Sequence, residues 1–123
     1  MRRPMYCTGV GKAMMACMSD EEVDRIWDSS DIQAYTPHTI VTRERLHDVL
    51  ESVRHRDCAF DNEENELGVR CIAAAIRDYT GKVCGALSIS APLMRMSDSY
   101  LAQLQPALLA TRDRIARDMG WNG

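Results

Sequence analysis

Two hydroxyls and one thiol lie in segments whose neighbours are mostly apolar. Ser88 and Ser90 belong to the run "CGALSIS", and Cys71 belongs to "GVRCIAAAI". If both runs are β-strands, the alternation of side chains puts Ser88 and Ser90 on the same face of a sheet. A buried hydroxyl without a partner costs about 1–3 kcal/mol. The two serines therefore bond to nearby backbone or face a ligand, and their spacing leaves both interpretations open.

A dense acidic run comes directly before the strand that contains Cys71. Asp61, Glu63, Glu64 and Glu66 fall within "DNEENE". The run resembles the start of an EF-hand loop, but its sixth position is Glu66 instead of glycine, which excludes that calcium site. We expect Glu63, Glu64 and Glu66 to be solvated. Asp61 ends the run "CAFD", and we expect it to point toward the concave side of the sheet.

The turn "TGVGK" could present backbone amides to an anion. Gly9 allows a ligand to approach the main chain, and Gly9 and Val10 lie where a helix is expected to begin. The turn is not a Walker loop, because the spacing of its glycines and the residue after its lysine do not match that motif. A turn of this kind is weak evidence when it stands alone.

An enzymatic function has little support in the sequence. Cys71 could be a small core side chain or could contact a ligand, and as a nucleophile it would need a nearby base. His47 and His55 lie on an expected helix outside its apolar stripe, and no GxSxG motif or zinc-type spacing of Cys and His occurs. We therefore expect no enzyme, no metal and no cofactor. A small-acid enzyme that uses Cys71 or Ser88 stays open as the alternative.

Composition limits the class of protein. The chain has 123 residues, of which 46% are hydrophobic and 27% are charged, as in one globular domain. The net charge is −3 and no basic stripe occurs, so we expect no direct contact with nucleic acid. No apolar run approaches the roughly 20 residues of a membrane helix, and no apolar segment follows Arg2 and Arg3 as in a signal peptide. The 5 cysteines form no CxxC pair, which indicates reduced thiols in a cytosol, most of them in the core.

The pattern predicts helices first, then strands, then a last helix. Ser19 and Glu22 form a capping-box sequence, Thr42 and Ser97 are plausible caps, and Gly81 supplies a hairpin signal. Pro106 lies inside the last helix and should kink or divide it. Three strands are few for this much helix, so we expect an α+β layer that lacks part of its sheet. The expected helices span 10–18, the residues after Ser19, 42–57, and Ser97 to about Gly120; the expected strands span 57–61, 68–78 and 82–90.

Five motifs together resemble the C-terminal effector-binding domain of IclR-type bacterial transcriptional regulators. They occur in the order and spacing of that family and extend from Pro4 to about Trp121. Each motif alone is weak, and the ordered set is far more specific. The motifs are "PMYCTGVGKAMMA", "YTPHTI", "DNEENELGVRCIAAAIRD", "GKVCGALSISAP" and "RMSDSYLAQLQPAL".

The resemblance implies a GAF/profilin-like α+β fold, in which a curved antiparallel sheet flanked by helices binds a small organic acid. It also implies a homodimer or homotetramer in the cytoplasm, without membrane contact, that binds DNA only through a separate winged helix-turn-helix domain. We expect residues 1–123 to be the effector domain without that DNA-binding domain and without its own opening portion, so that a sheet edge is exposed. Carried over by position, the effector site comprises Gly9, Val10, Asp61, Cys71, Ser88 and Ser90.

The presence of Asp61 in a site for an acid needs an explanation, because like charges repel. We expect the amides of Gly9 and Val10 and the hydroxyls of Ser88 and Ser90 to hold the carboxylate of the ligand. Asp61 would then accept a hydrogen bond from a hydroxyl or a hydrated carbonyl, which favours a hydroxy or keto acid. An oligomerisation module with a degenerate pocket is a further alternative.

Overall fold

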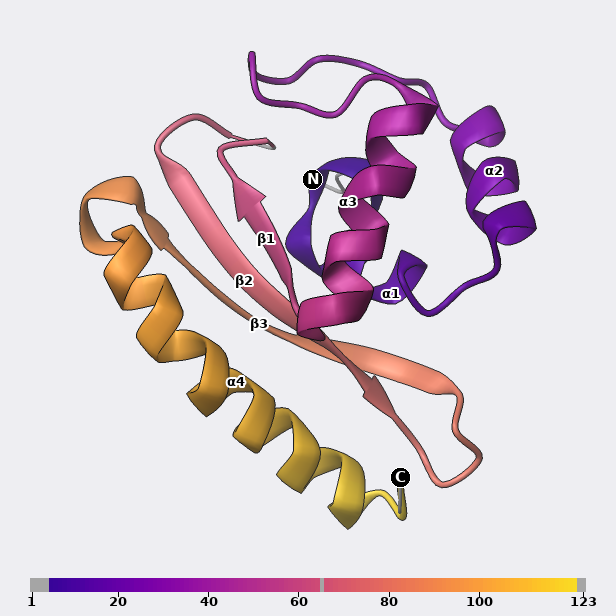
Figure 1. The fold of residues 1–123 in the computed structure, drawn as a ribbon, viewed down its shortest axis with the longest axis vertical. Helices are drawn as coiled ribbons and strands as arrows, with labels where there is room; N and C mark the ends of the chain where they lie inside the picture. Colours follow the sequence, from indigo (N-terminus) through magenta and orange to yellow (C-terminus); the bar gives the residue numbers. More distant parts are fainter. Residues whose placement is uncertain (1–4, 65, 122–123) are drawn as a thin grey trace.

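Three antiparallel strands form one sheet with helices on both faces (Figure 1). The structure is a computed structural model that describes residues 5–64 and 66–121; Pro4, where the resemblance begins, and Asn65 of the acidic run lie outside the described residues. The predicted α+β class and the order of elements are confirmed. The elements are α1 (Gly9–Met15), α2 (Asp20–Ser29), α3 (Arg43–Arg56), β1 (Ala59–Asn62), β2 (Val69–Arg77), β3 (Val83–Pro92) and α4 (Asp98–Asp118), with short 3-10 turns at Met5–Cys7 and Leu93–Arg95.

The predicted helix caps are present. The side chains of Ser19, Thr42 and Ser97 each accept a hydrogen bond from the amide three residues later, at the starts of α2, α3 and α4. Such caps satisfy amides that the helix itself leaves without a partner. The capping box differs in one detail, because the carboxylate of Glu22 accepts from the hydroxyl of Ser19, 3.2 Å away, and not from its main-chain amide.

Two helix predictions need correction. Helix α1 begins one residue earlier than expected and ends at Met15 instead of residue 18. Helix α4 runs without a break through Pro106, which was expected to kink or divide it. Leu101 and Leu108, on either side of this proline, are both buried against the sheet. This packing stabilises the helix at the position where Pro106 has no N–H group to donate a hydrogen bond. None of the described helices is long and apolar enough to cross a membrane.

Strand β2 lies between β1 and β3, and both neighbours run antiparallel to it. Gly81 forms the predicted hairpin turn between β2 and β3 with φ of 82°, and its amide donates to the carbonyl of Asp78 at 3.0 Å. A positive φ favours glycine. Within the described residues, the outer edge of β3 has no strand neighbour.

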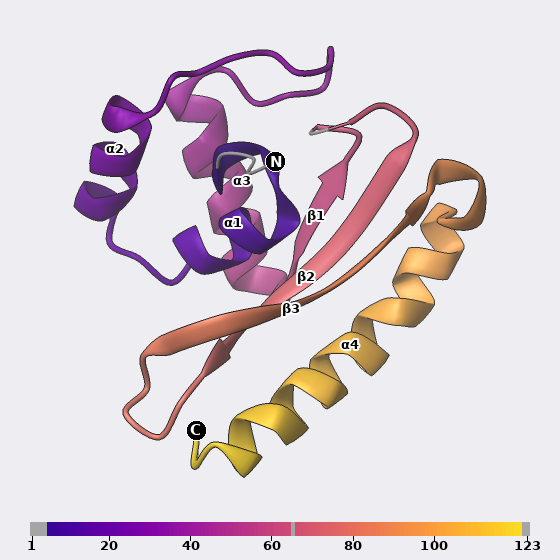
Figure 2. The same cartoon turned by 180° about the vertical axis from the view of Figure 1, so that it is seen from behind.

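The sheet separates two layers of helix (Figures 1 and 2). Helix α4 covers one face, and α1, α2 and α3 gather on the other. Alternation along β2 directs Cys71 and Ala73 toward the α1 side, whereas Ile72 and Ala74 pack with Leu108 of α4. Because both faces of β2 are covered, it reads as a nearly continuous apolar run.

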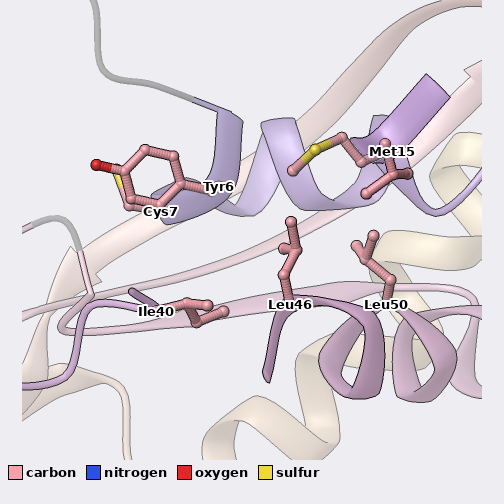
Figure 3. Close-up of a cluster of buried hydrophobic side chains, with 7 residues drawn as sticks. Tyr6, Cys7, Met15, Ile40, Leu46 and Leu50 are labelled. Atoms are coloured by element: carbon pink, nitrogen blue, oxygen red, sulfur yellow. The ribbon is translucent and has the colours of Figure 1, made fainter. Parts of the chain in front are cut away.

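A second part of the core joins α1 to α3. Figure 3 shows Met15 of α1 directed toward Leu46 and Leu50 of α3, with Cys7 in the same cluster. All five cysteines are free thiols, and Cys7, Cys58 and Cys71 are buried. The expectation that most cysteines pack in the core is right for Cys7 and Cys58, whereas Cys17 and Cys84 are exposed.

Replacing Leu50 by alanine tests this core. Leu50 is fully buried, so Leu50→Ala should lower the free energy of unfolding by about 2–5 kcal/mol, measured by urea denaturation. Leu67→Ala is the matched control, because Leu67 is 58% exposed and its removal should change stability by less than about 0.5 kcal/mol. Equal effects at the two positions would contradict the assignment of the core.

Candidate functional site

Three of the predicted site residues form one row across the sheet. Asp61 of β1 lies opposite Cys71 of β2, and Cys71 lies opposite Ser90 of β3. Ser88 lies opposite Ala73, the next position of the same face. The prediction that Ser88 and Ser90 share a face is therefore confirmed, and Asp61 and Cys71 lie on that same face.

Helix α1 begins against this row. A Cβ atom built on Gly9 would lie 3.0 Å from the Sγ atom of Cys71 and 3.8 Å from the Cβ atom of Asp61. Real Cβ atoms rarely approach another atom so closely, so glycine at residue 9 lets the first turn of α1 come this near without displacing the thiol of Cys71. Val10 packs against the apolar cluster on this face of the sheet, which contains Cys71 and Ala73. The structure thus brings the six predicted residues to one face of the sheet.

The thiol of Cys71 lies inside this group of polar side chains. Burial raises the pKa of Cys71, a hydrogen bond with Ser90 offsets part of that rise, and the charge of Asp61 adds to it. Lys12 and Ser88 act in the opposite direction with smaller effects. A catalytic thiol needs a lowered pKa, so the surroundings of Cys71 favour a neutral hydrogen-bonding side chain over a nucleophile.

The two serines are more exposed than expected. The sequence suggested buried hydroxyls in need of a partner, but Ser88 and Ser90 are both exposed, because they lie toward the end of β3, the outer strand of the described sheet. Water can satisfy an exposed hydroxyl, so these hydroxyls do not need an internal partner. The row is therefore enclosed at Gly9 and Cys71 and open along β3.

The acidic run contains a buried ion pair that the sequence did not reveal. Glu64 was expected to be solvated, but it is buried, and its Oε2 atom lies 2.6 Å from the Nζ atom of Lys12, which is only 1% exposed. The same ammonium donates to the carbonyl of Phe60, and Glu64 Oε2 also accepts from the amide of Asn62 at 3.2 Å. No group of the described residues donates to the other oxygen, Oε1. Of the remaining acidic residues, Glu66 is exposed as predicted, and Glu63 is half-buried.

The turn that carries Glu64 is held on several sides. The carboxylate of Asp61 accepts a hydrogen bond of 2.9 Å from the amide of Glu64 through its Oδ1 atom. The buried hydroxyls of Thr36 and Thr39, in the loop before α3, donate to the carbonyls of Glu63 and Glu64. The run enters the core because Asp61, Lys12 and these threonines fix its backbone and one of its side chains.

Lys12 is the residue that sequence reasoning missed. It lies four positions after Thr8, in the run "GVGKAMMACM", where every other residue is small or apolar. A lysine in an exposed helix usually has polar neighbours on its own face. The absence of any other polar side chain in this run was the available signal that Lys12 is buried.

A hollow of about 550 Å³ lies elsewhere, between α4 and the end of β2, and none of the six residues lines it. Arg112 is its most buried charge, and it already donates to Asp57, Asp113 and the carbonyl of Ala75. This arginine serves the packing of α4 on β2. Within the described ranges, no three His, Cys, Asp or Glu side chains are grouped so that they could hold a metal.

Comparison with known proteins matches most of the chain. Residues 1–117 match the family described as "Bacterial transcriptional regulator IclR C-terminal". The chain is 36% identical over 121 residues to the HTH-type transcriptional regulator KdgR of Escherichia coli strain K12, covering 98% of this chain and 46% of KdgR. The chain thus spans about half the length of the relatives it matches.

Solved structures have the same fold. The Agobacterium tumefaciens repressor BlcR superposes with a TM-score of 0.93 at 27% identity, covering all of this chain and 49% of BlcR. The C-terminal domain of E. coli KdgR has a TM-score of 0.91 at 36% identity, covering 98% of this chain and 74% of that domain. The inducer-binding domain of a double mutant of Acinetobacter PobR, solved in complex with 3-hydroxybenzoic acid, has a TM-score of 0.88 at 28% identity, with coverages of 94% and 66%.

The contact of Gly9 with Cys71 gives a structural prediction. Gly9→Ala should destabilise the fold by about 1–3 kcal/mol, because the new methyl group meets Sγ of Cys71. In a Cys71→Ala background the same change should cost clearly less, since Sγ is gone. Urea denaturation of the four proteins in this double-mutant cycle measures the coupling. Additive costs would show that α1 does not contact Cys71.

The surroundings of Cys71 give a pH-dependent prediction. Its raised pKa lowers the fraction of thiolate at a given pH, so alkylation by iodoacetamide should be slow and should still accelerate above the ordinary pKa of a thiol. Ser90→Ala removes a hydrogen bond that lowers this pKa and should move the profile to higher pH. Mass spectrometry of the peptide containing Cys71 follows the reaction. Ser52→Ala, on the exposed side of α3, is the control and should leave the profile unchanged.

Proposed function

Because the chain belongs to the IclR family of bacterial transcriptional regulators, we propose that it is the effector-binding domain of such a regulator and recognises a small organic acid without catalysis. The relatives named above are transcriptional regulators or repressors. The proposed effector-binding residues are Gly9, Val10, Asp61, Cys71, Ser88 and Ser90.

One observation carries the proposal. Asp61, Cys71 and Ser90 lie side by side in one row, and α1 meets that row at Gly9. Residues that are up to 81 positions apart thus converge on one face. A few polar groups gathered at a partly enclosed apolar surface are the usual composition of a small-molecule site.

The arrangement favours an acid that also carries a hydroxyl or a hydrated carbonyl. The amides of Gly9 and Val10 and the hydroxyls of Ser88 and Ser90 are donors suited to a carboxylate. Asp61 can only accept when it is ionised, and a carboxylate has about four acceptor positions. Asp61 can therefore hold the amide of Glu64 and accept a further bond from a ligand hydroxyl. The hydroxy acid in the PobR complex fits this class, and in that structure it belongs to PobR.

The effector would act by shifting an equilibrium between states of the regulator. It can shift that equilibrium only as far as its affinity differs between the two states. We propose that these states are arrangements of a cytoplasmic homodimer or homotetramer, in which a separate winged helix-turn-helix domain contacts DNA. The net charge of −3 on this chain agrees with a separate DNA contact.

A thermal-shift panel tests the proposal. Pyruvate, lactate, gluconate and 3-hydroxybenzoate are added to the chain, and a binding acid at a hundred times its Kd should add about 2.7 kcal/mol to the stability. Ser88→Ala should reduce the shift by about 0.5–1.5 kcal/mol, whereas Ser52→Ala should leave it unchanged. The acid should also be recovered unaltered after incubation. A panel without any shift would favour an oligomerisation module, and consumption of the acid would favour an enzyme.

Asp61→Asn tests the role of the carboxylate. Asparagine keeps a side-chain oxygen that can accept from the amide of Glu64, so the turn should persist and the melting temperature should change little. The charge that accepts the ligand hydroxyl is lost, so the affinity for lactate relative to propionate should fall by about tenfold, as for a charge-assisted hydrogen bond. Isothermal titration with both acids measures this ratio. An unchanged ratio would remove Asp61 from the site.

A further inference from the structure

We infer that Lys12 is a positioning residue: through Glu64 it holds Asp61 at a fixed distance from the start of α1, and so sets the preference for hydroxylated over plain acids. This inference rests on the proposed function of the same site. Lys12 itself is buried beneath the turn and is 1% exposed, so it acts through other residues.

A series of contacts joins the start of α1 to Asp61, the two sides of the proposed site. Lys12 lies one turn along α1 from Gly9, and its amide donates to the carbonyl of Thr8 at 3.0 Å. Its ammonium binds the carboxylate of Glu64 at 2.6 Å. The amide of Glu64 then binds the carboxylate of Asp61 at 2.9 Å. The backbone that presents Gly9 and the carboxylate of Asp61 are therefore linked through one ion pair.

Lys12 and Glu64 each have a second partner that fixes the ion pair in place. The ammonium of Lys12 also donates to the carbonyl of Phe60, the residue before Asp61. The carboxylate of Glu64 also accepts from the amide of Asn62, the residue after Asp61. Lys12 and Glu64 thus hold the main chain on both sides of Asp61, and the direction of its side chain depends on them.

Discrimination between acids should depend on this geometry. The donors proposed for the ligand carboxylate, at Gly9, Val10 and the serines, do not contact Lys12 in any described hydrogen bond. The acceptor proposed for the ligand hydroxyl is Asp61, and it is the group that Lys12 holds indirectly. Loss of the ion pair should therefore reduce the binding of hydroxy acids more than that of the same acids without the hydroxyl.

The test compares matched acids on the whole chain. Isothermal titration with lactate against propionate, and with 3-hydroxybenzoate against benzoate, gives a hydroxyl preference for each protein. Lys12→Met alone leaves Glu64 as an unpaired buried charge and should lower Tm by more than about 10 °C. Lys12→Met combined with Glu64→Gln removes both charges and should restore most of the Tm lost in Lys12→Met, because the double variant buries no unpaired charge.

The double variant decides the question. In the parent chain we expect about a tenfold preference for the hydroxylated acid, from one charge-assisted hydrogen bond. In the double variant this preference should fall below about twofold, while the Kd of the plain acid should stay within about twofold of its value in the parent. A structural role alone would weaken all acids equally or not at all, and either result would overturn the inference. If the parent binds none of the four acids, the proposed function fails instead.

Two further variants keep the test decisive. Arg43→Met with Asp28→Asn removes an exposed ion pair between α3 and α2 and should leave both Tm and the preference unchanged. If the double variant at Lys12 does not fold, Glu64→Asp retains both charges and shortens the link by one methylene group. It should reduce the hydroxyl preference with a smaller loss of Tm than Lys12→Met, and an unchanged preference would contradict the inference.

Discussion

Lys12 and Glu64 are 52 residues apart in sequence and lie against each other inside the protein. Removing two charges from water is costly, and their attraction repays that cost only when further hydrogen bonds complete the site. Here the carbonyl of Phe60 and the amide of Asn62 supply part of them, while Glu64 Oε1 has no donor among the described residues. A pair of apolar side chains would satisfy the fold equally well or better. What the ion pair adds is a fixed position: it ties the first helix to the turn after β1, and both sides of the proposed site depend on that link.

Local rules account for much of the fold. The caps at Ser19, Thr42 and Ser97 and the hairpin at Gly81 follow from interactions within a few residues, so they could be read from the sequence. Once Gly81 fixes the hairpin, alternation along β3 puts Ser88 and Ser90 on one face. The six site residues were assigned together only because the ordered motifs resemble a family; spacing alone left each of them ambiguous. The pairing of Lys12 with Glu64 could not be found in this way, because the two residues are remote in sequence. The unbroken helix at Pro106 could not be predicted for the same reason, since the residues that stabilise it lie on the sheet, remote in sequence.

The exposure of Ser88 and Ser90 affects how the site can bind. An exposed hydroxyl already bonds to water, so exchanging that water for a ligand oxygen gains only about 0.5–1.5 kcal/mol. Gly9, Asp61 and Cys71 are buried, and a polar group there loses more when it is left without a partner. The enclosed side of the row should therefore contribute most to selectivity, and the open side along β3 should contribute mainly to orientation. Strand β3 also has its outer edge unpaired in the described sheet, so any chain that pairs with this edge would cover the serines and strengthen their contribution.

The carboxylate of Asp61 fits a site for acids when selectivity between acids is considered together with affinity. Asp61 repels the charge of every acid to a similar degree, but only an acid with a suitably placed hydroxyl regains that loss as a hydrogen bond. With a plain acid, Asp61 keeps its bond to the amide of Glu64 but gains none from the ligand, so the plain acid binds less tightly than the hydroxylated one. The charges of Lys12 and Glu64 offset each other, so this ion pair orients Asp61 and changes the general repulsion little. Repulsion between acids and Asp61, offset by a hydrogen bond from a ligand hydroxyl, is thus a physical basis for choosing one small acid among many.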